Sequence, residues 1–341
     1  MTGEHVLITG ASGFIGFRVL VDTLKAGYRV RAAIRSPEKA RQILATPSIK
    51  ALNPGDRLAF VQVPDLEADG AYDDAIKGAQ YAIHVASPIP SAKVEEDVNL
   101  LDHFVNPAVR GTLGLLIAAE KAGSVRRVVI TSSCAAILPW EAIAAGDTQT
   151  VYNENSRVPS TTELGSLFEG YWASKVAALN EAEKWVALMN PSFDVIHLFP
   201  AYVIGRDELV TDVKYALNGS NQEVLVPVTG GDKRTPGLSV HVDDVAEAHV
   251  KCLDPSIAGN RSFVLACGGI QGTRWADSLE ITARKFKKEI DSGLLRNNGH
   301  AVSGPLKMDV SAAETVLGIR FRSFEEQVTD VVSFYVELAT A

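Results

Sequence analysis

The stretch HVLITGASGFIGFRVLVDTLKAGYRVRAAIRS, residues 5–36, decides the fold. A short apolar run at 5–9 leads directly into three glycines with the spacing GxxGxxG. A helical pattern follows, ends at Gly27, and gives way to a second apolar run at 28–34. A glycine-rich turn between a buried strand and a helix is the setting in which such a motif binds a dinucleotide. The alternative is a strand-to-helix turn that holds no ligand.

Each glycine of this turn has its own physical reason. Gly10 permits the tight turn, Gly13 lets the backbone approach a pyrophosphate at the helix N-terminus, and Gly16 lets the helix pack closely on the strand. Six residues of the turn are therefore expected to contact the cofactor: Gly10, Ser12, Gly13, Phe14, Ile15 and Gly16.

Apolar runs alternate with helical patterns through the first 200 residues. The runs are apolar on both faces, as buried parallel strands are, and cover 5–9, 28–34, 57–63, 81–86, 126–132 and 193–199. The helical patterns between them include 14–27, 111–123 and 174–189. This alternation predicts an α/β fold with a Rossmann-type doubly wound parallel sheet, whose ligands bind beyond the carboxyl ends of the strands.

The pattern changes after Pro200. Glycine, proline and asparagine cluster at 218–237, and helical patterns are confined to short segments such as 242–253 and 324–339. This part is expected to form a smaller C-terminal lobe. The expected division is a dinucleotide-binding domain over 1–200, a substrate-binding lobe over most of 201–341, and a return of parts of 237–265 to the first domain.

The composition argues against several classes of partner and site. The 341 residues carry a formal net charge of −8 and no block of basic residues, so nucleic acid is not an expected partner. The chain starts without a basic segment followed by an apolar one, and no apolar run reaches about 18 residues, so neither secretion nor membrane insertion is expected. Three scattered cysteines do not form a disulfide framework or a metal motif, and they fit a cytoplasmic protein.

The segment YWASK, from Tyr171 to Lys175, opens the third helical pattern. A spacing of four places the phenol and the ammonium on one face of a helix, where the cation can stabilise a phenolate. A phenol with a pKa of about 10 needs such help to transfer protons near neutral pH. Ser132 and Ser133 end the strand VVITSS upstream, where a hydroxyl can hold a substrate carbonyl oxygen against Tyr171. The alternative for the tyrosine and lysine is a solvated pair on a helix surface.

With the glycine turn, the serine pair and YxxxK in this order, the chain resembles the extended short-chain dehydrogenase/reductases. Several further segments resemble the branch that contains dihydroflavonol reductases, cinnamoyl-CoA reductases, and fungal aldehyde and ketone reductases. They are DLEADGAYDDAIKGAQYAIHVASP, NPAVRGTLGLLIAA, FPAYVIG and SVHVDDVAEAHV. The segments GAYDDAIKGA and TPGLSVHVDDVAEAHVKCLDP are most similar to fungal carbonyl reductases of the aldehyde reductase II type.

The resemblance implies a role for each residue of this set. Tyr171 would protonate the reduced oxygen, and Lys175 would lower the pKa of Tyr171 and bind the nicotinamide ribose. Ser133 matches the catalytic serine, with Ser132 as the second choice. The helix asparagine of the family has no secure counterpart, because Asn106 precedes a proline and lies further from VRGT than in nucleotide-sugar epimerases.

The resemblance also implies cofactor contacts outside the glycine turn. These residues follow the carboxyl ends of strands, and they are Asp65, Leu66, Ala86, Ser87, Pro200 and Val203. Asp65 would contact adenine, and the loop from Pro200 to Val203 would lie beneath the nicotinamide. The alternative for Asp65 is a turn residue at a strand end, and a loop that stops a strand explains Pro200 equally well.

Arg35 stands at the position after the second strand where NAD-binding proteins carry an acid. A guanidinium there can bind the 2′-phosphate of NADP with paired hydrogen bonds, and Lys39 adds charge one helical turn further on. The sequence therefore predicts NADPH/NADP+ as the cofactor. The alternative is a solvated cation at a strand end.

The leading hypothesis is an NADPH-dependent oxidoreductase that reduces an aldehyde or ketone to an alcohol. A nucleotide-sugar epimerase or dehydratase that uses NAD, and a non-catalytic NADP-sensing module, remain as alternatives. Trp140, Phe168, Tyr202 and the segment 205–235 are expected to border a pocket for an apolar or aromatic small molecule. No metal is expected, and the sequence does not decide the oligomeric state. His84, His197 and His241 are expected to be hydrogen-bonded structural residues.

Overall fold

The computed structural model describes residues 3–87 and 98–341 and forms two compact units. The first unit is built from Met1–Trp140, Glu154–Phe199 and Ala246–Phe263. The second unit is built from Glu141–Asn153, Pro200–Val245 and Val264–Ala341. The division thus differs from a boundary at residue 200, because strand β6 (Val151–Tyr152) pairs with β13 (Lys307–Met308) and draws its segment into the second unit.

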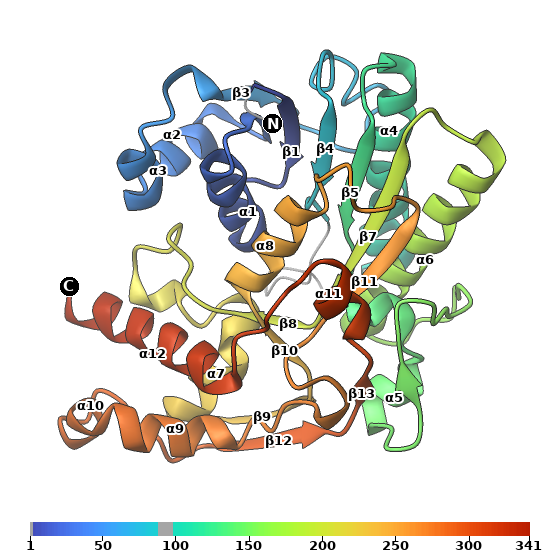
Figure 1. Cartoon of the computed structure of the whole chain (residues 1–341). Helices are drawn as coiled ribbons and strands as arrows, with labels where there is room; N and C mark the ends of the chain where they lie inside the picture. The colour runs from blue at the N-terminus through green and yellow to red at the C-terminus, as the bar shows by residue number, and fades with distance from the viewer. Residues whose placement is uncertain (1–2, 88–97) are drawn as a thin grey trace. The chain divides into compact units, whose positions relative to one another are not determined.

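A seven-stranded sheet with the order β11-β7-β5-β4-β1-β2-β3 organises the first unit (Figure 1). Its strands are β1 (His5–Thr9), β2 (Arg29–Ile34), β3 (Leu58–Gln62), β4 (Tyr81–His84), β5 (Arg127–Thr131), β7 (Asp194–Pro200) and β11 (Arg261–Leu265). All pairings from β3 across to β7 are parallel. The strand order reverses between β1 and β4, and ligands of such sheets bind at this reversal, outside the carboxyl ends of the strands. The predicted doubly wound α/β fold is confirmed.

Two strands depart from the expected pattern. β3 is not buried on both faces, since its side chains are half-buried or exposed, and it forms one edge of the sheet. β11 was not among the predicted strands, and it forms the opposite edge of the sheet next to β7.

Helices cover the sheet. They are α1 (Phe14–Lys25), α2 (Pro37–Ala45), α3 (Pro47–Leu52), α4 (Asn106–Ala122), α6 (Leu167–Met189) and α8 (Val242–Lys251), whose first four residues belong to the second unit. α4 and α6 pack side by side on one face, where their apolar side chains form a core with those of β1, β4, β5 and β7 (Figure 1). None of the helices in the described parts of the chain is long and apolar enough to span a membrane.

Helix α6 begins earlier than the helical pattern predicts. The hydroxyl of Ser166 caps it by accepting a hydrogen bond from the backbone N–H of Glu169 at 3.2 Å. Ser166 and Glu169 at this spacing are a typical start of a helix. Tyr171 therefore lies in the second turn, on a backbone that is already fixed.

Arg127 on β5 connects the sheet to a segment much later in the chain. Its side chain is buried and donates to the carboxylate of Asp194 at 2.5 and 2.9 Å. The same guanidinium donates to the backbone carbonyl groups of Cys252, Asp254 and Ile257 at 2.7–2.9 Å. All five N–H donors of an arginine can be used in this way, so the buried charge is well compensated.

The second unit consists of short strand pairs and six helices. β8 (Tyr202–Ile204) pairs with β10 (Ser239–His241), and β9 (Asp232–Pro236) pairs with β12 (His300–Gly304). The helices are α5 (Trp140–Ala145), whose first residue belongs to the first unit, α7 (Gln222–Val228), α9 (Asp277–Lys285), α10 (Lys287–Asp291), α11 (Ser311–Val316) and α12 (Phe324–Thr340). α7, α9 and α12 enclose a core that includes the fully buried Trp275.

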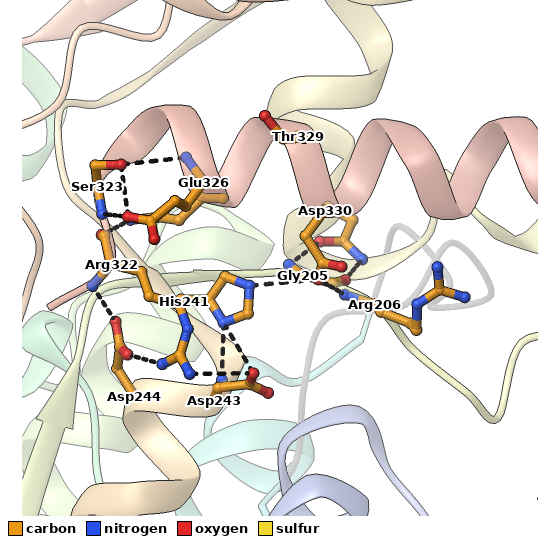
Figure 2. A network of polar contacts seen from close by, with 12 residues as sticks. Gly205, Arg206, His241, Asp243, Asp244, Arg322, Ser323, Glu326, Thr329 and Asp330 are labelled. Atoms are coloured by element: carbon orange, nitrogen blue, oxygen red, sulfur yellow. Dashed lines mark hydrogen bonds and ion pairs between the residues drawn. The ribbon is translucent and has the colours of Figure 1, made fainter. Parts of the chain in front are cut away.

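A network of polar contacts fixes the start of α12 within the second unit (Figure 2). Nε2 of the buried His241 lies 3.3 Å from the carboxylate of Asp330, which also accepts the backbone N–H of Arg206 at 2.8 Å. The backbone N–H of Arg322 donates to Asp244 at 2.8 Å, and the two side chains form an ion pair. His241 is therefore a hydrogen-bonded structural residue, as predicted.

Candidate active site

The glycine turn lies where the strand order reverses. Gly10 follows β1 with a φ of +73°, and a Cβ at this position would come within 2.6 Å of the backbone nitrogen of Ala86, which follows β4. A Cβ on Gly16 would collide with the carbonyl oxygen of Gly10. These two glycines are thus required by the turn itself and by the close packing of α1 on the strand.

Gly13 is different, because the protein around it does not require a glycine. A Cβ at Gly13 would meet no atom of the described chain closer than the Gly10 carbonyl oxygen at 3.5 Å. Gly13 is the N-cap of α1 and provides no side-chain cap, and the first turn of α1 holds no acidic residue. A bare helix N-terminus of this kind suits an anion, so the turn fits the pyrophosphate of a dinucleotide. The side chains of Ser12, Phe14 and Ile15 belong to the same turn.

Arg35 directly follows β2 and is exposed. Within residues 3–87 and 98–341, its guanidinium has no hydrogen-bond or ion-pair partner. The nearest acid in the sequence, Glu38, is paired with Arg41, and Lys39 donates to the side chain of Gln42 at 3.0 Å. Two basic side chains near the end of β2, with no acid directed at Arg35, fit a phosphate.

The loops after β3 and β4 bring four predicted residues to the same end of the sheet. Asp65 is exposed, and its carboxylate accepts the backbone N–H of Glu67 at 2.9 Å, which is turn geometry. Leu66 packs against the core beside α4. The backbone N–H of Ala86 donates to Thr9 Oγ1 at 3.3 Å, and Ser87 Oγ accepts a hydrogen bond from Lys175.

Tyr171 and Lys175 lie on one face of α6. Lys175 Nζ is buried, 5.5 Å from the centre of the Tyr171 ring, and donates to Ser87 Oγ at 2.8 Å. Burial lowers the pKa of Lys175 to about 8. Burial raises the pKa of Tyr171, and a hydrogen bond with the side chain of Ser133 acts in the opposite direction.

The expected lowering of the Tyr171 pKa by Lys175 stays a prediction. The ammonium lies over the ring and is bonded to Ser87, so the group that counteracts the effect of burial on the phenol is Ser133. At neutral pH the phenol therefore keeps its proton.

The two serines after β5 face different surroundings. Ser133 starts a short 3-10 turn, Cys134–Ile137, and its Oγ accepts the backbone N–H of Ala135 at 3.1 Å. Ser132 is buried and lines a small cavity between the sheet and the helices α4 and α6. This difference favours Ser133 over Ser132 as the partner of Tyr171.

Three aromatic side chains form a wall beside Tyr171. The ring of Phe168 stacks on that of Tyr171 with centres 6.2 Å apart, and Trp140 lies 5.8 Å from Phe168 and 5.9 Å from Trp172. Trp172 is fixed by a 2.9 Å hydrogen bond from its indole N–H to the carbonyl group of Leu138, whereas Phe168 is exposed. Trp172 is not among the residues predicted from the sequence, although its place inside YWASK was a usable signal.

The other two predicted structural histidines lie in strands of the first unit. Nδ1 of His84 lies 2.8 Å from Thr9 Oγ1. Nδ1 of His197 is buried, and nothing in residues 3–87 and 98–341 forms a hydrogen bond with it. The expectation that all three histidines are hydrogen-bonded within the protein is therefore wrong for His197.

Four further predicted residues lie at the start of α4 and in the strands β7 and β8. Asn106 starts α4, and its amide donates to Asp102 at 2.8 Å one turn earlier. Pro200 ends β7, and Val203 is buried in β8. The ring of Tyr202 packs edge-to-face on Trp275, 6.1 Å away, against the core of the second unit.

Comparisons with known proteins agree with this geometry. The family model described as "NAD dependent epimerase/dehydratase family" matches residues 6–266. The chain is 39% identical to ketoreductase CTB6 of Cercospora nicotianae, over 99% of this chain and 96% of that protein. It is 30% identical to dihydroflavonol 4-reductase of Arabidopsis thaliana, over 76% of this chain and 64% of that protein.

Solved structures show the same fold. The yeast methylglyoxal/isovaleraldehyde reductase Gre2, solved as a complex with NADPH, superposes with a TM-score of 0.82 at 26% identity, over 98% of this chain and 99% of that chain. The predicted resemblance is confirmed. This chain therefore belongs to the NAD dependent epimerase/dehydratase family of extended short-chain dehydrogenase/reductases, an NAD(P)-binding family that includes these reductases.

Proposed function

We propose that this oxidoreductase uses NADPH to reduce the carbonyl group of an aromatic ketone or aldehyde to an alcohol. The observation that carries the proposal is the position of Tyr171: its phenol is held by α6, interacts with Ser133, and adjoins both Lys175 and an aromatic wall. Relatives named ketoreductase support the carbonyl substrate, and the NADPH complex of the yeast reductase supports the cofactor.

The residues of the first unit fit a dinucleotide phosphate cofactor. Gly10, Gly13 and Gly16 would let α1 hold the pyrophosphate, Arg35 would hold the 2′-phosphate, and Lys175 would bind the nicotinamide ribose. The chemistry supplied by NADPH, when bound, is transfer of a hydride to the carbonyl carbon. Asp65, Leu66, Ala86 and Ser87 remain proposed cofactor contacts, as do Pro200 and Val203.

The side chains of this protein act on the carbonyl oxygen. Ser133 donates a hydrogen bond that orients this oxygen, and Tyr171 gives it a proton as negative charge develops. Because burial keeps the phenol protonated at neutral pH, Tyr171 starts in the form that an acid needs. The positive charge of Lys175 then stabilises the phenolate left behind. The net reaction consumes one NADPH and one solvent proton for each carbonyl group reduced.

A panel assay tests the proposal. Oxidation of NADPH is followed with aromatic ketones and aldehydes, matched aliphatic ketones, and a nucleotide diphosphate sugar. We expect turnover with carbonyl compounds and the highest kcat/KM for an aromatic one. Conversion of the nucleotide sugar without net use of cofactor would show an epimerase instead, and binding of NADPH without turnover of any carbonyl compound would show a sensing module.

Removal of the exposed aromatic side chain should change substrate preference. Phe168→Ala is expected to raise KM for the aromatic substrate by about 2- to 10-fold, the equivalent of one aromatic contact, and to change KM for an aliphatic ketone little. The comparison is made by steady-state kinetics on both substrates. Leu188→Ala removes another exposed apolar side chain of α6 and should change neither KM value. An equal rise of KM for both substrates would contradict an aromatic contact at Phe168.

Removal of the guanidinium at the end of β2 should change cofactor preference. Arg35→Ala is expected to weaken NADPH binding by about 1.5–3 kcal/mol, the usual contribution of a hydrogen bond to a charged group, and to leave NADH binding almost unchanged. Dissociation constants for both cofactors, measured by fluorescence titration, test this. Arg41→Ala, in α2, removes one positive charge in the same way. Because Arg41 is paired with Glu38, this control should change the affinity for NADPH little. Equal weakening of NADPH binding and NADH binding would mean that Arg35 does not bind the 2′-phosphate.

A further inference from the structure

A groove on the second unit lies beside strand β12. Its volume is about 440 Å³, which is within the range of sites that bind a ligand. Its lining residues come from the segments 147–148, 270–276 and 301–307 and from Gly237, and all of them belong to the second unit. The lining includes neither the residues gathered at Tyr171 nor the segment 205–235 that is expected to border the substrate pocket. The groove therefore consists of residues to which no role has been given.

Backbone hydrogen bonds show which way the residues of β12 point. The N–H of His300 donates to the carbonyl group of Gly231 at 3.2 Å, and at the other end of the strand the carbonyl group of Gly304 accepts the N–H of Gly237 at 2.7 Å. Both bonds run to the two ends of β9, which lies beside β12 (Figure 1). Because the residues of a parallel ladder alternate between its two sides, Val302 also bonds towards β9.

Ala301 and Ser303 therefore direct their backbone N–H and C=O groups to the opposite side of β12. In the sheets formed by the described residues, β9 is the one neighbour of β12, and no hydrogen bond among these residues reaches the four backbone groups. Both residues line the groove. An unpaired strand edge of this kind is a template for one more strand, which main-chain hydrogen bonds would hold in place.

The loop around Gly272 is held close to the end of this strand pair. Gly272 has a φ of +65°, and a Cβ at this position would come within 2.8 Å of the carbonyl oxygen of Gly237 and 3.0 Å of that of Leu306. The backbone N–H of Thr273 donates to the same oxygen of Gly237 at 2.6 Å. The backbone on this side of the groove is thus fixed by short contacts, and a largely preformed groove lowers the entropic cost of binding.

The side chains at the groove favour a partner that is both apolar and acidic. Ile270 and Val302 line it with exposed fractions of 60% and 51%, although both are large apolar residues. Lys307 also lines the groove, and its ammonium has no acidic partner in the part of the chain that the structure describes. Arg274 adds a second positive charge, and its Nε lies 3.7 Å from the carboxylate of Asp277.

Asp147 supplies a carboxylate to the lining, but its oxygens are already used within the protein. They accept the backbone N–H groups of Gln149 at 2.7 Å and Thr150 at 3.1 Å, and the hydroxyl of Tyr152 at 2.9 Å. These hydrogen bonds, together with one from the side chain of Thr150, which has the largest effect, lower the pKa of Asp147. Two cations and one carboxylate leave the lining with a positive balance, on a chain whose net charge is −8.

We propose that this groove binds an extended peptide segment of another protein, which adds a strand to β12 and carries apolar side chains and an acidic one. The main chain of the peptide pairs with Ala301 and Ser303. Its apolar side chains cover Ile270 and Val302, and its acidic side chain binds Lys307. A second copy of this chain fits less well, because a two-fold interface places the positive charges of both grooves against each other. The inference does not depend on the proposed function.

A displayed library of short random peptides is the probe, and the whole protein is the target. Selection should enrich sequences that combine β-branched residues with Asp or Glu. Isothermal titration with a synthetic peptide of the enriched sequence then gives its Kd. If the enriched sequences are the same on the wild type and on a variant with a blocked β12 edge, the inference is wrong.

Ala301→Pro is the variant with the blocked edge. Proline removes an N–H that points away from β9, so the ladder between β12 and β9 keeps its hydrogen bonds. We expect the Kd of the peptide to rise about 3- to 10-fold, the equivalent of one main-chain hydrogen bond. Ala301→Ser keeps the N–H and should leave the Kd unchanged. An unchanged Kd in a folded Ala301→Pro protein would overturn the inference.

Two modified peptides test the strand pairing without any change in the protein. One is N-methylated at every second amide, and the other at the amides between them. In an added strand, alternate N–H groups face β12, so only one of the two peptides should lose binding. Equal binding of both would show that side chains alone are recognised, which contradicts an added strand. This test also holds if Ala301→Pro does not fold.

Reversal of one charge tests the acidic contact. Lys307→Glu is expected to raise the Kd of the peptide about 5- to 20-fold, and a peptide with lysine in place of its acid should recover binding to this variant. Lys288→Glu is the matched control, because Lys288 is an exposed lysine of α10 that does not line the groove. An equal rise of the Kd in Lys288→Glu would mean that only overall charge attracts the peptide.

Two further measurements identify the occupant. A crystal structure of the complex should show the peptide as an extended strand beside β12. If N-acetylglutamate bound as tightly as the peptide, the groove would be a site for small organic acids. If light scattering showed a dimer that Ala301→Pro dissociates, a second copy of the chain would be the occupant. Either of these two results would overturn the inference.

Discussion

Replacement of Tyr171 by phenylalanine is expected to lower kcat by about 10²- to 10⁴-fold and to leave NADPH affinity nearly unchanged. The substitution removes one hydroxyl and keeps the ring that stacks on Phe168, so the wall and the helix remain as they are. The variant loses the proton that the phenol donates in the transition state. Only a water that enters the site could donate a proton in its place. Single-turnover rates with the best substrate of the panel, together with titration of NADPH, measure the two effects separately.

Tyr72→Phe is a matched control for this prediction. Tyr72 is a buried tyrosine of the first unit, whereas Tyr171 is half-buried, and the Tyr72 hydroxyl has no hydrogen-bond partner among the described residues. Loss of an unsatisfied buried hydroxyl is neutral or stabilising, so Tyr72→Phe should keep wild-type kcat and at least wild-type thermal stability. If Tyr171→Phe retained more than about a tenth of wild-type kcat, Tyr171 would not be the acid.

Ser133→Ala is expected to lower kcat by about 10²- to 10³-fold, the range found when one donor to a developing oxyanion is removed. Two effects combine, because the hydroxyl both orients the carbonyl oxygen and opposes the rise in the Tyr171 pKa caused by burial. Ser133→Thr keeps a hydroxyl and should recover part of the loss. The readout is kcat with KM measured in parallel, since a transition-state contact changes kcat more than KM.

Ser132→Ala is the matched control, because it removes the hydroxyl of the neighbouring serine by the same substitution. Ser132 lines the small cavity between the sheet and the helices α4 and α6, so loss of its hydroxyl should lower kcat much less than loss of the Ser133 hydroxyl. A greater loss in Ser132→Ala than in Ser133→Ala would reverse the choice between the two serines.

Local signals predicted much of the fold and the site. The turn around Gly10 and Gly16 depends on contacts between residues close in sequence or on neighbouring strands, and its role was visible from spacing alone. Tyr171 and Lys175 share a helix, so their juxtaposition follows from the helical period. The start of α6 at Leu167 was missed, although Ser166 and Glu169 have the spacing of a helix cap.

Other features depend on contacts that no local pattern encodes. The wall beside Tyr171 needs Trp140 to meet Trp172 across 32 residues, and the cavity brings together His84 and His197 from two strands. The raised pKa of Tyr171 was also not predictable, since it depends on how deeply the phenol is buried and on where Lys175 points. Such effects arise from packing, and spacing in the sequence does not determine packing.

The bonds of Arg127 have a consequence for how the chain is made. The carbonyl groups of Cys252, Asp254 and Ile257 follow Arg127 by 125 to 130 residues. At about 5–20 residues per second, the ribosome takes roughly 6 to 26 s to supply them after β5 has been synthesised. During this interval the Arg127 guanidinium lacks these three carbonyl partners. Once β7 has been made, its outer edge stays unpaired until β11 follows. Molecular chaperones protect unpaired sheet edges of this kind, so the segment around residues 252–265 ends the exposure of the β7 edge.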